Sequence, residues 1–154
     1  MCIRDRGNEI VGDDGVGIEA ARQLERRLAD RVGVEVVALP WAGLSLLDVL
    51  VARRRAALID CLQSGLYATG TVVRLDVERP FGSARLLSFH DLDLRTALAL
   101  GRRLGWPLPS EIALGGVEGE PAEVFGVGLS TAVAAALPEL VDQVVDFLDQ
   151  QPLE

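Results

Sequence analysis

The chain has 154 residues, the size of one domain, and 49% of them are apolar, so it can bury a core without disulfides or metals. Its 15 basic and 23 acidic residues give a net charge of −8, which disfavours nucleic-acid backbones and anionic lipid surfaces as partners. All of the basic residues are arginine, which excludes mechanisms that need a lysine, such as a Walker-type phosphate loop or a Schiff base.

Targeting signals and cysteine chemistry are also missing from the sequence. No apolar run approaches the roughly 18 residues that span a bilayer, and residues 1–6 lack the apolar stretch of a secretory signal. We therefore expect a cytoplasmic protein without membrane insertion. Cys2 and Cys61 match no zinc-ribbon or disulfide framework, so we expect two reduced thiols without a catalytic role.

The first half of the chain alternates helical and extended patterns. Apolar residues recur at helical spacing over residues 16–32, which predicts an amphipathic helix. Residues 34–39 are β-branched and predict a strand, and residues 46–53 predict a short helix. Residues 56–59 form an unbroken apolar run, typical of a strand covered on both faces, which ends at Asp60. The Asp60 carboxylate is therefore expected at the carboxyl end of a buried strand.

The second half continues the alternation. Residues 73–77 alternate in polarity, which predicts a half-exposed edge strand, and a loop containing His90 leads into a helix over residues 92–104. Residues 112–114 predict another strand, and Ser130 is expected to cap the final helix. The whole pattern predicts a single α/β domain with a twisted, mainly parallel sheet of about five strands and helices on both faces, because parallel strands need crossover connections.

The first strand of such a sheet is expected to precede the first glycine-rich turn. Residues 1–6 do not fit this strand, because Arg4, Asp5 and Arg6 would bury three consecutive charges at a cost of roughly several kcal/mol each. We therefore expect the first strand to be missing or replaced by unrelated residues through truncation, and the domain to occupy residues 7–151.

An aspartate pair lies in the glycine-rich turn of residues 7–17, just before the first predicted helix. One interpretation is that Asp13 or Asp14 caps this helix and satisfies its free N–H groups. Two neighbouring carboxylates repel each other, however, so the second aspartate is available to face a cation or to share a proton.

The same turn satisfies the dinucleotide-binding pattern G-x-G-x-x-A through Gly15, Gly17 and Ala20. Three observations disfavour this alternative. The preceding strand is missing, the aspartate pair would repel a pyrophosphate, and Glu35 lies at the start of the next strand, whereas a ribose-binding acid belongs at its end.

Asp14, Asp60 and His90 come from three segments that an α/β fold can bring to one edge of its sheet. Separately, Asp60 can be a turn residue, and His90, the single histidine, can be a surface or capping residue. Together, two carboxylates and an imidazole suit zinc, nickel or manganese with one position open for water or substrate. A metal held there would polarise a carbonyl and activate water, so the three residues predict metal-assisted hydrolysis.

In combination, these motifs resemble those of the hydrogenase maturation endopeptidases. The matching segments are Gly7-Asn8, Asp13 to Gly17, Ile59-Asp60, Ser88-x-His90, Gly116 to Gly119 and Leu129-Ser130. The resemblance covers nearly the whole chain from Gly7 onward, and the combination is more specific than any single segment. The chain departs from the family pattern at Cys61, where alanine is common.

The resemblance implies a cytoplasmic, metal-dependent endopeptidase that removes a C-terminal peptide from the nickel-loaded precursor of a nickel-iron hydrogenase large subunit. Asp14, Asp60 and His90 would contact nickel supplied by the substrate, and zinc or another divalent ion can substitute in the isolated protein. Whether the nickel acts as a Lewis acid or only as a recognition element stays open. The non-enzymatic alternative is a nickel-dependent docking or chaperone protein, which would bind the precursor without shortening it.

Overall fold

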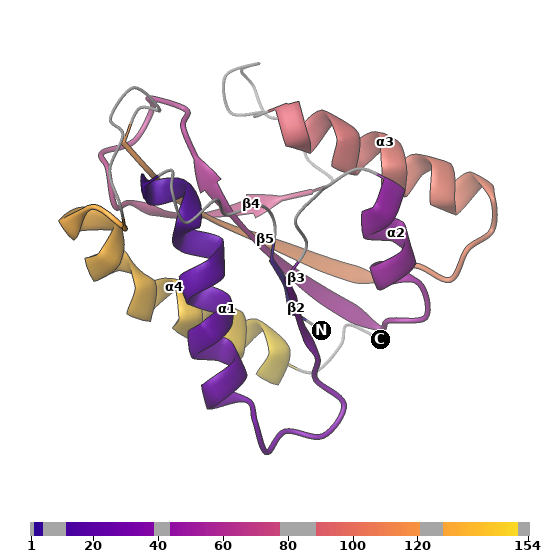
Figure 1. The fold of residues 1–154 in the computed structure, drawn as a ribbon. Coiled ribbons are helices and arrows are strands. Elements are labelled where there is room, and N and C mark those ends of the chain that lie inside the picture. Colours follow the sequence, from indigo (N-terminus) through magenta and orange to yellow (C-terminus); the bar gives the residue numbers. More distant parts are fainter. Residues whose placement is uncertain (1, 5–11, 39–43, 78–88, 121–127, 151–154) are drawn as a thin grey trace.

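A computed structural model describes residues 2–4, 12–38, 44–77, 89–120 and 128–150, which form an α/β domain (Figure 1). Within these residues, five strands make one sheet. The strands are β1 (Cys2–Arg4), β2 (Val36–Ala38), β3 (Arg55–Leu62), β4 (Val72–Asp76) and β5 (Glu111–Glu118). The helices are the short 3-10 helix η1 (Gly12–Gly15), α1 (Val16–Arg27), α2 (Leu44–Leu50), α3 (Phe89–Arg103) and α4 (Thr131–Asp149).

The strand order is β2-β1-β3-β5-β4, and every pairing is parallel except the one between β4 and β5. This confirms the mainly parallel sheet and the edge position predicted for residues 73–77. In the central register, Asp60 lies opposite Gly116, and Leu62 lies opposite Glu118. The carboxyl ends of β1, β3 and β5 therefore meet at one edge, which is where ligands bind in such folds.

The first strand is present in the structure, so the expectation that it would be missing was wrong. Cys2–Arg4 form β1, which lies between β2 and β3 and pairs Cys2 with both Val36 and Ala57. The argument from three buried charges fails because the strand ends at Arg4, so it contains only one of the three charged residues. Asp5 and Arg6 lie outside the described residues.

Helices cover both faces of the sheet, as expected: α1 and α4 lie on one face, and α2 and α3 on the other (Figure 1). Ile59 of β3 packs in a cluster with Leu24 of α1 and Leu140 of α4. Its neighbour Leu58 packs in the opposite cluster with Leu47 of α2. Successive side chains of a strand point to opposite faces, which explains the unbroken apolar run in β3. Among the described helices, none is long and apolar enough to cross a bilayer.

Element boundaries near the site differ from the predicted ones. β3 continues two residues beyond Asp60 to Leu62, and β5 extends on both sides of residues 112–114. α3 begins at Phe89, so His90 lies in its first turn and not in the preceding loop. The unbroken apolar run stops before Asp60, which led us to expect a strand end there. The backbone of β3 nevertheless keeps pairing with β5 as far as Leu62.

Candidate functional site

Buried acidic side chains gather at the carboxyl edge of the sheet. Asp13, Asp60 and Glu118 are 7%, 9% and 2% exposed, and they come from η1, β3 and β5. Asp14 follows Asp13 in η1 and is half-buried. Because an unpartnered buried charge is costly, each of these carboxylates needs a hydrogen-bonding or ionic role.

Asp13 joins η1 to two distant segments. Its Oδ1 accepts a hydrogen bond from the backbone N–H of Ser130 at 2.6 Å. Its Oδ2 accepts from the Ser130 hydroxyl and from the backbone N–H of Glu120, both at 2.9 Å. The N-cap of α1 is Gly15, which makes no side-chain capping bond. Asp13 therefore binds the segment after β5 and the start of α4 and does not act as the cap of α1.

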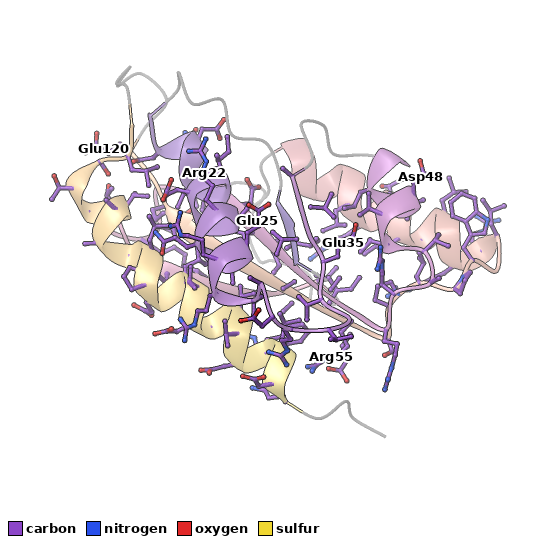
Figure 2. The ribbon with its side chains drawn as sticks, turned by 60° about the horizontal axis from the view of Figure 1, so that its bottom comes forward. Arg22, Glu25, Glu35, Asp48, Arg55 and Glu120 are labelled. Atoms are coloured by element: carbon purple, nitrogen blue, oxygen red, sulfur yellow. The ribbon has the colours of Figure 1, made fainter. Side chains whose placement is uncertain are left out.

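Ser130 has two roles in this contact. Its hydroxyl donates to Asp13 and also accepts a hydrogen bond from the backbone N–H of Val133 at 3.4 Å. This confirms Ser130 as the N-cap of α4. Figure 2 shows Glu120 beside the start of the same helix, so the two residues that donate to Asp13 lie close together.

Glu118 fixes the loop after β3. Its carboxylate accepts hydrogen bonds from the Ser64 hydroxyl and the Gly65 N–H, each at 2.7 Å. Its backbone adds two bonds, because its N–H donates to the Thr71 carbonyl at 2.9 Å and its carbonyl accepts from the Gly70 N–H at 2.7 Å. Both ends of the loop over residues 63–71 are thus tied to the end of β5.

Cys61 follows Asp60 in β3, within the electrostatic influence of four acidic residues. It is a free thiol, 6% exposed. Burial raises its pKa most, and four nearby carboxylates raise it further, in the order Asp60, Asp14, Asp13 and Glu118. The thiol therefore stays protonated, which supports the expectation that cysteine is not the nucleophile. The same effect places Asp14 and Asp60 within electrostatic reach of one sulfur atom.

Gly119 allows the elements that carry these residues to approach closely. A Cβ at this position would lie 2.6 Å from Cys61 Sγ and 3.0 Å from Asp13 Cβ. Its N–H donates to the Leu62 carbonyl at 2.8 Å, which holds the glycine against β3. Any larger residue would crowd Cys61 and Asp13.

The predicted site residues are brought together in part. Asp14 and Asp60 both lie at the carboxyl edge. From Arg103 the chain turns back to enter β5 at Glu111, so α3 runs against β5 and its first turn, which contains His90, points toward the carboxyl edge (Figure 1). The side chain of His90 lies outside the described residues, so the convergence of all three residues stays a prediction.

Among the described side chains, no group of three His, Cys, Asp or Glu residues is arranged to hold a metal ion. This finding does not test the predicted set of Asp14, Asp60 and His90, because the side chain of His90 is not among those described. Two of the predicted metal ligands, the carboxylates of Asp14 and Asp60, lie at this edge. Together with an imidazole, these oxygen ligands suit a divalent ion.

Sequence reasoning missed the roles of Asp13, Ser64 and Glu118. The available signal for Glu118 was an acidic residue between Val117 and Gly119 at the end of an apolar strand. The roles of Asp13 and Ser64 depend on partners far along the chain, so they had no local signal.

A cavity of about 390 Å³ lies at the other end of the sheet, lined in part by Arg53 and Arg55. Figure 2 shows Glu120 near the start of α4 and Arg55 near its end. Arg53 pairs with Glu35, and Arg55 pairs with Glu111 at 2.8 Å. These arginines are neutralised by acidic partners, and the cavity is separate from the acidic edge.

The dinucleotide alternative loses one of its three counterarguments, since β1 is present. The other two stand. Asp13 and Asp14 place negative charge at the start of α1, where a pyrophosphate would bind. Glu35 precedes β2 and pairs with Arg53 at the amino ends of the strands, away from the position of a ribose ligand.

Comparisons with known sequences agree with one another. The family described as hydrogenase maturation protease matches residues 18–147. The hydrogenase 2 maturation protease of Escherichia coli (strain K12) is 30% identical over 149 residues, which cover 96% of this chain and 90% of that protein. The hydrogenase expression/formation protein HoxM of Azotobacter vinelandii is 29% identical over 153 residues, which cover 98% of this chain and 73% of that protein.

Solved structures show the same likeness. A hydrogenase maturating endopeptidase from Escherichia coli superposes with a TM-score of 0.71 at 26% identity, covering 96% of this chain and 92% of the other. A NiFe hydrogenase maturation protease from Thermococcus kodakarensis gives a TM-score of 0.70 at 25% identity, covering 97% of this chain and 98% of the other.

Proposed function

The chain belongs to the hydrogenase maturation protease family, and from this premise we propose that it removes a C-terminal peptide from the precursor of a nickel-iron hydrogenase large subunit. The observation that supports this most is that Asp14 and Asp60 both lie at the carboxyl edge of the sheet, toward which the first turn of α3 points. Hydrolysis of a peptide bond needs polar groups gathered at one place.

The substrate's nickel is the group that we assign to Asp14, Asp60 and His90. Two carboxylates and one imidazole match a divalent ion of this type. Asp13 and Glu118 have structural roles, and Cys61 stays protonated, so these neighbours are not assigned as ligands. In the isolated protein, we expect zinc or another divalent ion to occupy the same ligands.

Two mechanisms fit these residues. In the first, the nickel polarises the scissile carbonyl while Asp14, Asp60 and His90 hold the metal in place. In the second, the nickel only positions the precursor, and one of the carboxylates accepts a proton from the attacking water as a general base. Both need the carboxylates in their charged form, and neither needs a serine or cysteine nucleophile.

The charge of the site makes nickel loading a checkpoint. Asp13, Asp14, Asp60 and Glu118 all raise the pKa of one thiol in a chain of net charge −8, so the edge favours a cation. A precursor without nickel offers no cation to this edge, and it should bind more weakly. The protein would then select the nickel-loaded precursor by the metal that it carries.

The test is incubation of the protein with the precursor prepared with and without nickel, followed by mass measurement of the large subunit. We expect a discrete loss of mass from the nickel-loaded precursor only. A stable complex in which the precursor keeps its full mass would overturn the protease proposal and favour the docking or chaperone alternative. The Asp60→Asn variant, incubated in parallel, shows whether any shortening comes from a contaminating protease.

A further inference from the structure

The adjacent aspartates of η1 differ in their surroundings. Asp13 is 7% exposed, and both of its carboxylate oxygens accept hydrogen bonds, whereas Asp14 is half-buried. The short helix η1 has only four residues, Gly12–Gly15, and a 3-10 turn of this length has few internal hydrogen bonds. Contacts with the rest of the protein must therefore set its orientation.

We propose that Asp13 is a positioning residue that fixes Asp14 for the processing reaction. This inference rests on the proposed function. The backbone N–H groups that bind Asp13 come from two segments, Glu120 after β5 and Ser130 before α4, and they bind different oxygen atoms. The carboxylate can therefore neither rotate nor shift without breaking a bond. Because Asp14 is the next residue, this clamp also fixes its backbone.

The close packing around Asp13 supports the same role. Gly119 leaves no room for a Cβ between Cys61 and Asp13, so η1 rests directly against the end of β3. Asp60, the second carboxylate assigned to the nickel, is the residue before Cys61. Asp13 therefore sets the placement of Asp14 relative to Asp60, as outer-shell groups commonly do for metal ligands.

Asp13→Asn tests the clamp because the two side chains have nearly the same size. Three donors face the two oxygens of Asp13, and two of these donors are backbone N–H groups bound to different oxygens. An asparagine would present its NH₂ group to one of these N–H groups, and neither can accept a hydrogen bond. The variant should therefore lose the clamp without leaving a cavity.

Two controls separate positioning from other effects. Glu118→Gln removes one buried charge from the same acidic cluster, at a carboxylate whose described hydrogen bonds go to Ser64 and Gly65 and not to η1. Ser130→Ala removes one donor and the cap of α4, but it leaves both backbone donors to Asp13. The first control reports the effect of charge alone, and the second reports the effect of lost stability together with the loss of one of the three bonds to Asp13.

The experiment measures kcat and KM on nickel-loaded precursor, and Ni²⁺ affinity of the isolated protein by calorimetry, at a temperature where circular dichroism shows every variant to be folded. For Asp13→Asn we expect kcat and Ni²⁺ affinity to fall by about 10- to 100-fold, and for both controls a clearly smaller change. If Asp13→Asn does not fold, Asp13→Ser, which keeps an acceptor in a smaller side chain, replaces it.

The inference would be overturned if Asp13→Asn lost no more kcat and Ni²⁺ affinity than Glu118→Gln or Ser130→Ala. A wild-type protein that binds Ni²⁺ but leaves the precursor intact would instead refute the proposed function, and the Ni²⁺ affinities would still decide whether Asp13 positions Asp14. If the wild type neither binds Ni²⁺ nor shortens the precursor, both proposals fall.

Discussion

Asp13 accepts two hydrogen bonds from Ser130, one from its backbone N–H at 2.6 Å and one from its hydroxyl at 2.9 Å, although the residues are 117 positions apart in the sequence. The contact closes η1 onto the start of α4. It joins the turn that carries Asp14 to a helix whose face packs in the core with α1 and β3. The stability of the fold and the placement of the site thus depend partly on the same contact.

Removal of the Ser130 hydroxyl should therefore destabilise the protein measurably. Ser130→Ala loses the cap of α4 and one donor to a buried carboxylate, so we expect the free energy of unfolding to fall by about 1–3 kcal/mol in urea titrations. Thr131→Ala, at the exposed next position, should change it by less than about 0.5 kcal/mol. Equal effects of the two substitutions would contradict the assigned role of Ser130.

The assigned nickel ligands lead to a second prediction. Asp14→Asn, Asp60→Asn and His90→Ala should each slow processing of the nickel-loaded precursor by about 100-fold or more, because each removes a ligand or a proton acceptor. Far-ultraviolet circular dichroism should stay close to that of the wild type. Asp48→Asn, at an exposed position on α2 (Figure 2), is the matched control and should process normally. Normal rates in all three site variants would refute the assignment.

Close packing at Gly119 leads to a third prediction. Gly119→Ala should destabilise the protein by about 1–3 kcal/mol, because the new Cβ would lie 2.6 Å from Cys61 Sγ. Cys61→Ala removes that sulfur, so the double variant should recover part of the loss. Full recovery is not expected, because Asp13 Cβ would remain 3.0 Å away. Thermal or urea unfolding of the four proteins gives the coupling, and additive effects would show that the clash is absent.

The sheet and the shared edge could be predicted from the sequence because they depend on local patterns and general topology. The unbroken apolar run before Asp60 predicted a buried parallel strand, and parallel strands bring their carboxyl ends together. The position of Asp14 and Asp60 at this edge follows from the rule without any knowledge of side-chain contacts. The placement of Ser130 as an N-cap was equally local.

The remaining features depend on partners that are distant in sequence. Asp13 was interpreted as a possible cap of α1, since nothing nearby indicates that its partners are Glu120 and Ser130. β1 was missed because counting charges in residues 1–6 did not indicate that the strand would end at Arg4. In both cases a tertiary contact overrides the local preference.

Cys61 provides a prediction on pH. Its pKa is raised above the ordinary 9.0 by burial and by the carboxylates around it. The folded protein therefore keeps this proton at pH values where the unfolded chain releases it, so the contribution of Cys61 to stability is complete below pH 9.0 and falls as the pH rises above it. The free energy of unfolding should decline more steeply above that pH in the wild type than in Cys61→Ala.

Alkylation gives a direct check on the same thiol. Iodoacetamide should modify Cys61 slowly in the folded protein at pH 8 and rapidly in urea, because the thiolate is the reactive form. Peptide mapping separates Cys61 from Cys2, which serves as the internal reference. Rapid labelling of Cys61 in the folded protein would show that the thiol is neither buried nor protonated.

Glu118 leads to the last prediction, which concerns the loop over residues 63–71. Glutamine can keep both contacts of this carboxylate, since its carbonyl can accept from the Gly65 N–H while its NH₂ group donates to the Ser64 hydroxyl. Alanine can keep neither, and it leaves the Gly65 N–H and the buried Ser64 hydroxyl without this partner, at a cost of about 1–3 kcal/mol. Amide hydrogen exchange at Gly65 should therefore stay slow in Glu118→Gln and become fast in Glu118→Ala. Slow exchange in both variants would mean that the backbone bonds of Glu118 to Gly70 and Thr71 hold the loop without the carboxylate.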